Sequence, residues 1–448
     1  MTERAPMSRR RLRAALTLTL ATCLTAAAAA GGASAASAVP LRTEAVRADT
    51  WSADAGHVGA VAGRADRLAT LVRQAVDAGV PGVAVRIDNG HGPAVESTEQ
   101  APWTVADHKL AVDDEFRMGS NTKTLVATLI LQLVAEHQVN LTDSVESWLP
   151  GLVPGGGAIT LRMLLNHTSG LYDYTDDPAG LASVTGQDQR QWTPEELLAL
   201  ATRHQALFTP GKKWFYSNTN YIALGMVLEK ATGRSVADLI DERIVRPLGL
   251  THTYLATTAA WRPGDSRTHT HGYEPDAAHL GPLLPPGMPP GTSFAGPIHD
   301  DHVNTTGINP SWAWAAGAVV SSAADWARFD TALMSGELLP PAQLRQMRTT
   351  VPEDSAAPEA TRYGLGLEEV RTPCGTVWGH TGGIPGYASQ NYTDSTGHRT
   401  VAILTSTVFG LSERKVAATY RPLVDAAVCR MLGKTAPGTA AQSTALPG

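Results

Sequence analysis

A serine and a lysine three positions apart are the residues whose types and spacing most directly suggest chemistry. Ser120 and Lys123 lie in Phe116-Arg-Met-Gly-Ser-Asn-Thr-Lys-Thr-Leu-Val126. Positions i and i+3 of a helix share a face, so the hydroxyl and the amine would be within reach of each other. The apolar run that follows predicts a buried helix, and burial favours the neutral amine that a base requires. The alternative is a capping serine followed by an ordinary surface lysine.

A second polar segment could present side chains into a cleft. It is Phe215-Tyr-Ser-Asn-Thr-Asn-Tyr221, and it follows the breaker pair Pro210-Gly211. Tyr216 could exchange a proton with Ser120 or with the leaving group, and Asn218 could hold a substrate amide. An aromatic packing residue and a turn asparagine are an equally good interpretation of this segment alone.

Two histidines lie in segments of similar polarity. His167 is in Leu164-Leu-Asn-His-Thr-Ser-Gly-Leu-Tyr-Asp-Tyr174, and His380 begins His380-Thr-Gly-Gly383. Because Ser120 already has a nearer candidate base, we interpret His167 as a loop histidine that is hydrogen-bonded within its own turn. His380 follows a strand pattern, so we expect it on a strand.

The composition limits the function classes. The chain has 448 residues, is 43% hydrophobic and 17% charged, and carries a formal net charge of -6. This length allows a large core or two lobes that share one interface. Mild acidity without a long basic run gives no basis for binding nucleic acid or an anionic membrane surface.

A Pro/Gly-rich stretch over 261–310 predicts a long irregular excursion over the surface. Its histidines and aspartates lack the spacing of a recognisable metal site, so we interpret them as surface residues and expect neither metal nor cofactor. They are His269, His271, His299, Asp300, Asp301 and His302.

The first 38 residues have the pattern of an export signal. Ser8-Arg-Arg-Arg-Leu-Arg13 precedes a short apolar segment and two small-residue cleavage sites, so the mature chain would begin near Ala36 or Val39. The paired arginines fit a twin-arginine signal as well as a general secretory one, and the apolar segment is too short to span a membrane. Lipidation at Cys23 is a less favoured alternative to release into the medium. We therefore expect a secreted protein.

Two cysteines, Cys374 and Cys429, remain after removal of the signal. In an exported protein a single disulfide is the natural assignment, and two separate buried thiols are the alternative. A twin-arginine route would fold the chain before export, which argues mildly against oxidation.

Helical spacing and strand alternation place the main elements. Helices are predicted over 64–78, from Ser120 onwards, over 193–208, 220–232, 323–334 and 412–432. Strands are predicted over 83–87, 363–367, 376–383, 387–393 and 400–407. Pro422 would lie in the first turn of the closing helix or kink it.

Strands near both ends with helices between them predict an α/β (α+β) architecture, in which helices flank one antiparallel sheet built from both terminal parts. The sheet lobe would comprise 39–118 and 311–432, and 119–310 would form a mostly helical lobe with the surface excursion. Residues 433–448 would be a disordered tail. Ser120 then lies at the junction of the lobes, with Tyr216 on the helical side and His380 on the opposite wall.

The three groups Ser120-x-x-Lys123, Tyr216-x-Asn218 and His380-Thr-Gly382 resemble, in this order, those of the penicillin-recognising serine hydrolases. That superfamily contains serine β-lactamases, penicillin-binding proteins and D-alanyl-D-alanine carboxypeptidases. The likeness spans about Leu68 to Cys429 and is greatest to the secreted, soluble actinomycete type of carboxypeptidase. The shared stretches are residues 169–174, 216–220 and 331–336, together with the cysteine pair.

The resemblance implies a β-lactamase/transpeptidase-like fold and a role for each site residue. Ser120 would be acylated, Lys123 and Tyr216 would transfer its proton, and Asn218 would orient the acyl chain. The backbone amides of Ser120 and Gly383 would form the oxyanion hole. The resemblance further places Trp312, Thr381 and Gly383 among the substrate-binding residues. His380, where class C β-lactamases have lysine, favours a peptidase over a β-lactamase.

Two departures from the carboxypeptidase pattern concern groups that would bind a substrate carboxylate. Glu368-Glu369 stands where an arginine is expected, and Gly383 stands where a threonine is expected. A glutamate facing the leaving-group side would repel a free carboxylate, whereas Arg371 could swing in as a replacement.

We expect a monomeric D-alanyl-D-alanine carboxypeptidase-like hydrolase that acts on small or peptidoglycan-derived peptides and is inhibited by β-lactams. The first alternative is an esterase, D-amino-acid amidase or D-aminopeptidase on the same scaffold. A β-lactamase is the next alternative. A non-catalytic cell-wall binding protein is disfavoured because Ser120, Lys123 and Tyr216 are all present.

Overall fold

The computed structural model describes residues 56–261, 269–284 and 288–436. The predicted export signal with Cys23 and the last twelve residues of the predicted tail lie outside the described residues. Within the described ranges, no helix combines the length and apolar character needed to cross a membrane.

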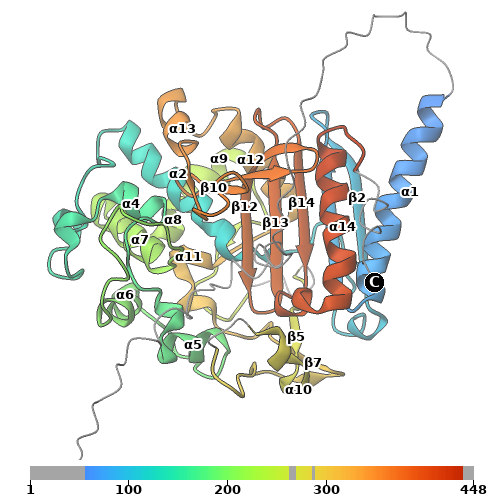
Figure 1. The fold of residues 1–448 in the computed structure, drawn as a ribbon, viewed down its shortest axis with the longest axis horizontal. Coiled ribbons are helices and arrows are strands. Elements are labelled where there is room, and N and C mark those ends of the chain that lie inside the picture. The colour runs from blue at the N-terminus through green and yellow to red at the C-terminus, as the bar shows by residue number, and fades with distance from the viewer. Residues whose placement is uncertain (1–55, 262–268, 285–287, 437–448) are drawn as a thin grey trace, which may run out of the picture.

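An eight-stranded antiparallel sheet forms the centre of the molecule and confirms the predicted fold class (Figure 1). Its strands in spatial order are β2 (Pro93–Gln100), β1 (Gly82–Asp88), β14 (Thr400–Thr405), β13 (Tyr387–Thr393), β12 (Gly375–Ile384), β11 (Glu368–Thr372), β10 (Thr361–Tyr363) and β9 (Val351–Pro352). Strands from the two ends of the described chain meet at the β1–β14 pair, where Val83 lies opposite Thr405. The sheet is therefore assembled from both terminal parts.

Two small sheets lie outside this one. The first contains β3 (Phe116–Arg117), β8 (Val319–Ser321) and β4 (Tyr254–Leu255). The second contains β5 (Tyr273–Pro275), β7 (His302–Asn304) and β6 (Ile298–His299). Since β3 immediately precedes Ser120, the first small sheet fixes the entry of the chain into the candidate site.

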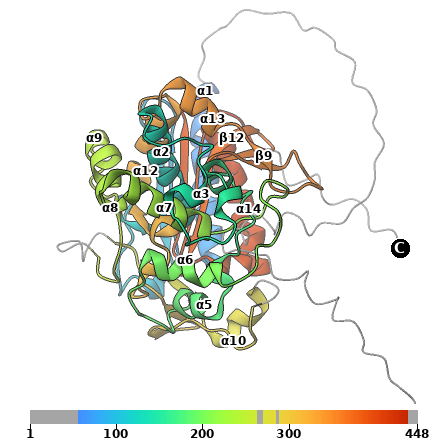
Figure 2. The ribbon, with the colours of Figure 1, turned by 90° about the vertical axis from the view of Figure 1, so that its left-hand side faces the viewer.

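The helices occupy both faces of the large sheet and a separate region beside it. They are α1 (Gly56–Asp77), α2 (Thr122–Ala135), α3 (Val145–Trp148), α4 (Leu161–Leu165), α5 (Pro178–Val184), α6 (Pro194–Thr202), α7 (Thr219–Thr232), α8 (Val236–Ile240), α9 (Arg246–Leu248), α10 (Ala277–Leu280), α11 (Trp314–Gly317), α12 (Ala323–Met334), α13 (Pro341–Met347) and α14 (Arg414–Met431). Helices α1 and α14 pack on one face, and α12 covers the other (Figure 2).

Helix α2 is the buried axis of the helical region, and α7, α8, α11 and α13 pack around it. Eleven of its fourteen residues are buried, which accounts for a sequence that is apolar on nearly every face. Residues of α2 and of the sheet belong to one continuous hydrophobic cluster. A rigid core therefore supports the segment that begins with Ser120.

Several predicted elements have different bounds in the structure. The strand predicted over 363–367 is wrong, because Gly364 and Gly366 lie in a turn between β10 and β11. The helix predicted over 193–208 ends at Thr202. Pro422 lies well inside α14, so its placement in the first turn is also wrong.

The predicted excursion over 261–310 is more ordered than its composition indicates. Its described part contains the small sheet β5–β7–β6 and helix α10. His302 stacks on Trp103 with ring centroids 4.8 Å apart, and His299 lies 5.0 Å from the same ring. These histidines are half-buried rather than free on the surface, since Trp103 supplies an apolar face against which they pack.

Cys374 and Cys429 form a disulfide with a Cα–Cα distance of 5.2 Å, as predicted. The bond joins the turn before β12 to α14 across 55 residues of sequence. A cross-link over a loop of this length stabilises a fold by about 2–4 kcal/mol, mainly by restricting the unfolded chain.

Candidate active site

Ser120 lies in a 3₁₀ turn, Gly119–Asn121, directly before α2. The turn packs closely against β12. A Cβ on Gly382 would lie 2.0 Å from the carbonyl oxygen of Met118, and one on Gly119, whose φ is +52°, would lie 2.7 Å from the nitrogen of Gly383. Only glycine permits this approach. The two glycines therefore bring Ser120 next to Gly383.

Lys123 is fully buried, and its amine contacts three oxygen atoms. Nζ lies 3.0 Å from Ser120 Oγ, 2.8 Å from Asn218 Oδ1 and 2.7 Å from the carbonyl oxygen of Ala316. The two carbonyl oxygens can only accept, so a neutral amine donates its two N–H groups to them and directs its lone pair at the Ser120 hydroxyl. This is the arrangement of a nucleophile and its base.

Burial lowers the pKa of Lys123 to about 7, against the attraction of Asp173 and Glu368. A substantial fraction of the amine is therefore neutral near pH 7. The predicted proximity and burial of the Ser120–Lys123 pair are present in the structure.

Tyr216 lies beside this pair. The Lys123 nitrogen is 4.8 Å from the centroid of its ring. The hydroxyl is buried and has no hydrogen-bond partner of ordinary geometry within the described residues. Burial raises the pKa of Tyr216 well above its usual value, and the nearby Ser120 hydroxyl partly opposes this effect. Tyr216 is thus a neutral phenol whose proton is close to the nucleophile.

Asn218 is held by a carboxylate that sequence reasoning did not single out. Asp173 Oδ2 accepts from both the backbone nitrogen and Nδ2 of Asn218, each at 2.9 Å. Oδ1 accepts from the backbone nitrogen and hydroxyl of Thr175, at 3.0 and 2.9 Å. Asp173 therefore turns the Asn218 carbonyl oxygen toward Lys123. The available signal was an aspartate positioned to cap the turn 174–176.

His380 is buried on β12, and both ring nitrogens have partners inside the protein. Nδ1 contacts the carbonyl oxygen of Thr381, so this nitrogen carries the proton. Nε2 then accepts from the Tyr363 hydroxyl at 2.8 Å. Burial lowers the pKa of His380 to about 3, so the ring is neutral.

Glu368 points inward from β11 rather than toward a leaving group. It is 5% exposed, and its Oε1 accepts from the Thr381 hydroxyl at 3.2 Å. Its Oε2 is buried without a hydrogen-bond partner among the described residues. Burial raises the pKa of Glu368 to about 7. The expected repulsion of a carboxylate in the cleft is therefore not supported by this geometry.

Arg371 is also remote from the site. It is exposed and pairs with Glu359 at 2.6 Å. It lies opposite Thr376 on β12, seven residues before Gly383, which corresponds to roughly 23 Å along the strand. The structure therefore does not place Arg371 at the cleft, where it could replace the expected arginine.

A small pocket opens at Ser120. Its lining within the described residues is Ser120, Tyr174, Thr175, Asn218, Trp312, Ala313, Ala316, Gly317, Gly383 and Ile384. Of the predicted substrate-binding residues, Asn218, Trp312 and Gly383 are in this set, whereas the Thr381 side chain is turned to Glu368. A larger hollow between β1 and α12 lies elsewhere, and its described lining holds no comparable nucleophile and base.

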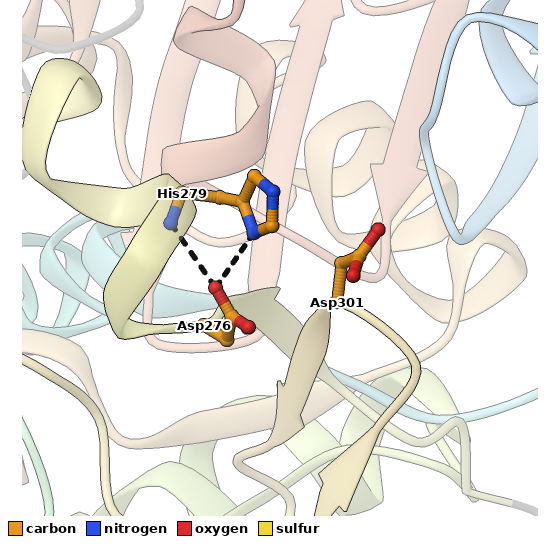
Figure 3. A group of neighbouring side chains, drawn as sticks. All are labelled: Asp276, His279 and Asp301. Atoms are coloured by element: carbon orange, nitrogen blue, oxygen red, sulfur yellow. Dashed lines mark hydrogen bonds and ion pairs between the residues drawn. The ribbon is translucent and has the colours of Figure 1, made fainter.

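One group elsewhere has the residue types of a metal site: Asp276, His279 and Asp301 (Figure 3). Asp276 Oδ1 already accepts from the backbone nitrogens of Ala278 and His279, at 3.0 and 3.1 Å, and from His279 Nδ1 at 2.7 Å. These bonds cap the start of α10. The group is therefore explained as a helix cap on the surface.

Comparison with known proteins agrees with this geometry. The β-lactamase family matches residues 68–426. The crystal structure of a D-stereospecific amidohydrolase from a Streptomyces species is 36% identical, with a TM-score of 0.65, and the alignment covers 78% of this chain and 97% of that one. D-amino acid amidase from Ochrobactrum anthropi SV3, in complex with D-phenylalanine, is 26% identical over 83% of this chain and 100% of its own, with a TM-score of 0.69.

Among curated proteins, penicillin-binding protein 4* of Bacillus subtilis (strain 168) is 29% identical over 298 residues. That alignment covers 66% of this chain and 60% of the relative's length. The predicted superfamily is thereby confirmed. With a family match over residues 68–426 and with Lys123 close to both Ser120 and Tyr216, the chain belongs to the β-lactamase family.

Proposed function

We propose that this protein is a serine amidohydrolase that cleaves amides or esters of D-configured amino acids through an acyl-enzyme on Ser120. The observation that carries the proposal is the absence of a charged residue from the described lining of the Ser120 pocket. A carboxypeptidase that recognises a free terminal carboxylate needs a cation or several donors at that end of the substrate. A neutral lining instead suits a neutral leaving group.

The D-configuration is proposed from the two solved relatives, whose descriptions name D-stereospecific and D-amino acid substrates. Trp312, Tyr174 and Ile384 give the pocket apolar walls. Such walls favour a compact apolar side chain on the acyl part of the substrate.

In the proposed reaction, Ser120 Oγ attacks the substrate carbonyl carbon while its proton passes to Lys123 Nζ. The backbone N–H groups of Ser120 and Gly383 stabilise the oxyanion. The leaving amine or alcohol takes a proton from Tyr216 or Lys123 as its bond to the carbonyl breaks. Water then hydrolyses the ester on Ser120 with the same groups acting in reverse, and Asn218 orients the acyl chain throughout.

D-alanyl-D-alanine carboxypeptidase activity is the second candidate. It is favoured by the His380-Thr-Gly segment on β12 and by the similarity to a penicillin-binding protein. Under this alternative the substrate carboxylate would be bound by neutral donors of the pocket, such as Trp312 Nε1, or by backbone amides at its rim. Export remains part of either proposal, since the signal pattern at 1–38 and the disulfide are typical of exported proteins.

The test compares a peptide ending in D-alanyl-D-alanine with its C-terminal amide and methyl ester, using mass spectrometry to identify the bond that is cleaved. We expect kcat/KM for the neutral substrates to exceed that for the free acid by about ten-fold or more, because the pocket offers no cation to offset the cost of removing the carboxylate from water. Ser120→Ala should abolish both turnover and the acyl adduct. Preference for the free acid would overturn the amidohydrolase assignment in favour of the carboxypeptidase.

A further inference from the structure

His167 lies in a backbone conformation that few side chains adopt. Its φ is +60°, in the left-handed region, and the residue is fully buried. This conformation costs about 1–2 kcal/mol for most residues, whereas glycine tolerates it and asparagine, aspartate and histidine adopt it more often than other side chains. The contacts of the buried His167 ring show what holds the residue in this conformation.

The contacts of His167 converge on Tyr216 and its two neighbours in sequence. The backbone nitrogen of Phe215 donates to the His167 carbonyl oxygen at 2.9 Å. The backbone nitrogen of Ser217 donates to Nδ1 of the ring at 3.1 Å. The imidazole stacks on the Tyr216 ring, with centroids 4.2 Å apart and planes 25° apart. One residue thus fixes the backbone on both sides of Tyr216 and the plane of its ring.

A hydrogen-bond network sets the tautomer of this histidine. Nδ1 also faces Asn220 Nδ2 at 3.0 Å, and Asn220 Oδ1 accepts from Ser169 Oγ at 2.6 Å. Since Ser217 and Asn220 both offer N–H groups to Nδ1, this nitrogen is an acceptor and the proton is on Nε2. Burial lowers the pKa of His167 well below its usual value, and the positive charge of Lys123 lowers it further. The ring therefore stays neutral and keeps its acceptor.

Tyr216 needs such support because its hydroxyl, although near Ser120, has no hydrogen-bond partner of ordinary geometry within the described part of the chain. Its position relative to Ser120 is set by packing and by the backbone of 215–217 rather than by a bond at its reactive atom. An error of about 1 Å in the placement of a catalytic group can lower the rate about 100-fold.

We infer that His167 is a positioning residue that holds Tyr216 at the nucleophile through an acceptor at Nδ1. The inference rests on the proposed proton-transfer role of Tyr216. It also replaces the interpretation of His167 as a residue bonded within its own turn, because both donors to its ring come from the segment 217–220.

The test compares His167→Asn with His167→Gly, using the p-nitroanilide of D-alanine as substrate. Both residues tolerate the left-handed conformation and both lose the ring, but only asparagine retains an acceptor at the position of Nδ1. We expect His167→Gly to lower kcat about 10- to 100-fold with KM within about three-fold of wild type. We expect His167→Asn to recover most of the loss. Exposed His398 provides a matched control, and His398→Asn should be unchanged.

A double-mutant cycle with Tyr216→Phe separates the inference from the proposed function. If His167 acts through Tyr216, His167→Gly should cause little further loss in the Tyr216→Phe background. Equal kcat in His167→Asn and His167→Gly, at any level, or a full additive loss in the double mutant, would overturn the positioning role. Wild-type activity in Tyr216→Phe alone would instead remove Tyr216 from the proposed mechanism.

Discussion

Two buried carboxylates, Asp173 and Glu368, act on Lys123 from different parts of the fold, and they differ in how well they are solvated by the protein. Asp173 accepts four hydrogen bonds, two at each oxygen. Glu368 is bonded through one oxygen, and the other is buried without a partner among the described residues. A buried carboxylate can keep its charge when donors replace water, and otherwise it takes up a proton.

The difference assigns distinct tasks to the two groups. Burial raises the pKa of Asp173 as well, but its hydrogen bonds and the attraction of Lys123 oppose that rise and favour the anion, which holds Asn218 in place. Glu368, whose pKa burial raises to about 7, is largely a neutral acid at lower pH and bonds the Thr381 side chain. Although both are buried acidic residues, Asp173 therefore contributes a negative charge beside Lys123, whereas Glu368 contributes a hydrogen bond within the sheet.

The largest expected effect follows from removing the group on which both carboxylates act. Lys123→Ala should lower kcat/KM by about 10³-fold, because the nucleophile loses its base. The measurement is the acylation rate with a chromogenic D-alanine ester. Lys230→Ala, on the exposed side of α7, is the matched control and should behave as wild type. Retained acylation in Lys123→Ala would mean that another group takes the Ser120 proton. Asp173 and Glu368 would then not act on the catalytic base.

A smaller but diagnostic loss is expected for Asp173→Asn. The change keeps the shape but removes the charge and one acceptor, so kcat should fall about 10- to 100-fold as Asn218 loses its fixed orientation. Attraction to Asp173 raises the pKa of Lys123. Its loss should move the rising limb of the pH profile, expected near pH 7, to lower pH by about one unit. The check is kcat/KM from pH 5 to 9.

Measuring kcat/KM from pH 5 to 9 for Glu368→Gln compares the effect of this carboxylate with that of Asp173. A neutral amide resembles a protonated carboxyl group, so we expect kcat to change by less than about three-fold and the limb to shift by less than in Asp173→Asn. An equal shift in the two variants would contradict the distinction, because it would mean that both groups carry the same charge beside Lys123.

The smallest effect concerns stability. The pKa of Glu368 rises from an ordinary 4.5 to about 7 in the folded protein. The folded state therefore retains a proton that the unfolded chain releases, and this contribution to stability is full below about pH 4.5 and is lost as the pH rises through 7. Unfolding in guanidinium at pH 5 and pH 8 should show a smaller pH-dependent decrease for Glu368→Gln than for wild type. If the pH-dependent fall in the free energy of unfolding were the same in Glu368→Gln and wild type, it would come from another buried acid, such as Glu274.

Much of this arrangement follows from the sequence because it depends on local pattern. The Ser120–Lys123 spacing, the buried run of α2 and the alternation in β13 and β14 are each set by neighbours in sequence. Helix α12 has the predicted bounds for the same reason.

The remaining features depend on contacts between distant segments. The bonds from Asp173 to Asn218 span 45 residues, and no local pattern distinguishes that aspartate from an ordinary turn residue. The direction of Glu368 depends on the register of β11 against β12, since a shift of one residue would turn it to the other face. The exposed pairing of Arg371 with Glu359 likewise depends on how the strands meet.

The pairing of β1 with β14 also has a consequence for biosynthesis. Val83 on β1 cannot pair with Thr405 on β14 until more than three hundred further residues have left the ribosome. Pairings so distant in sequence are slow to form, because the entropy of closing the loop is lost before the contacts are gained. The wall that carries Gly383 is then absent while Ser120 and Lys123 are already synthesised. The nascent chain should therefore be inert toward substrate, and the appearance of acylation during translation would report the closure of the sheet.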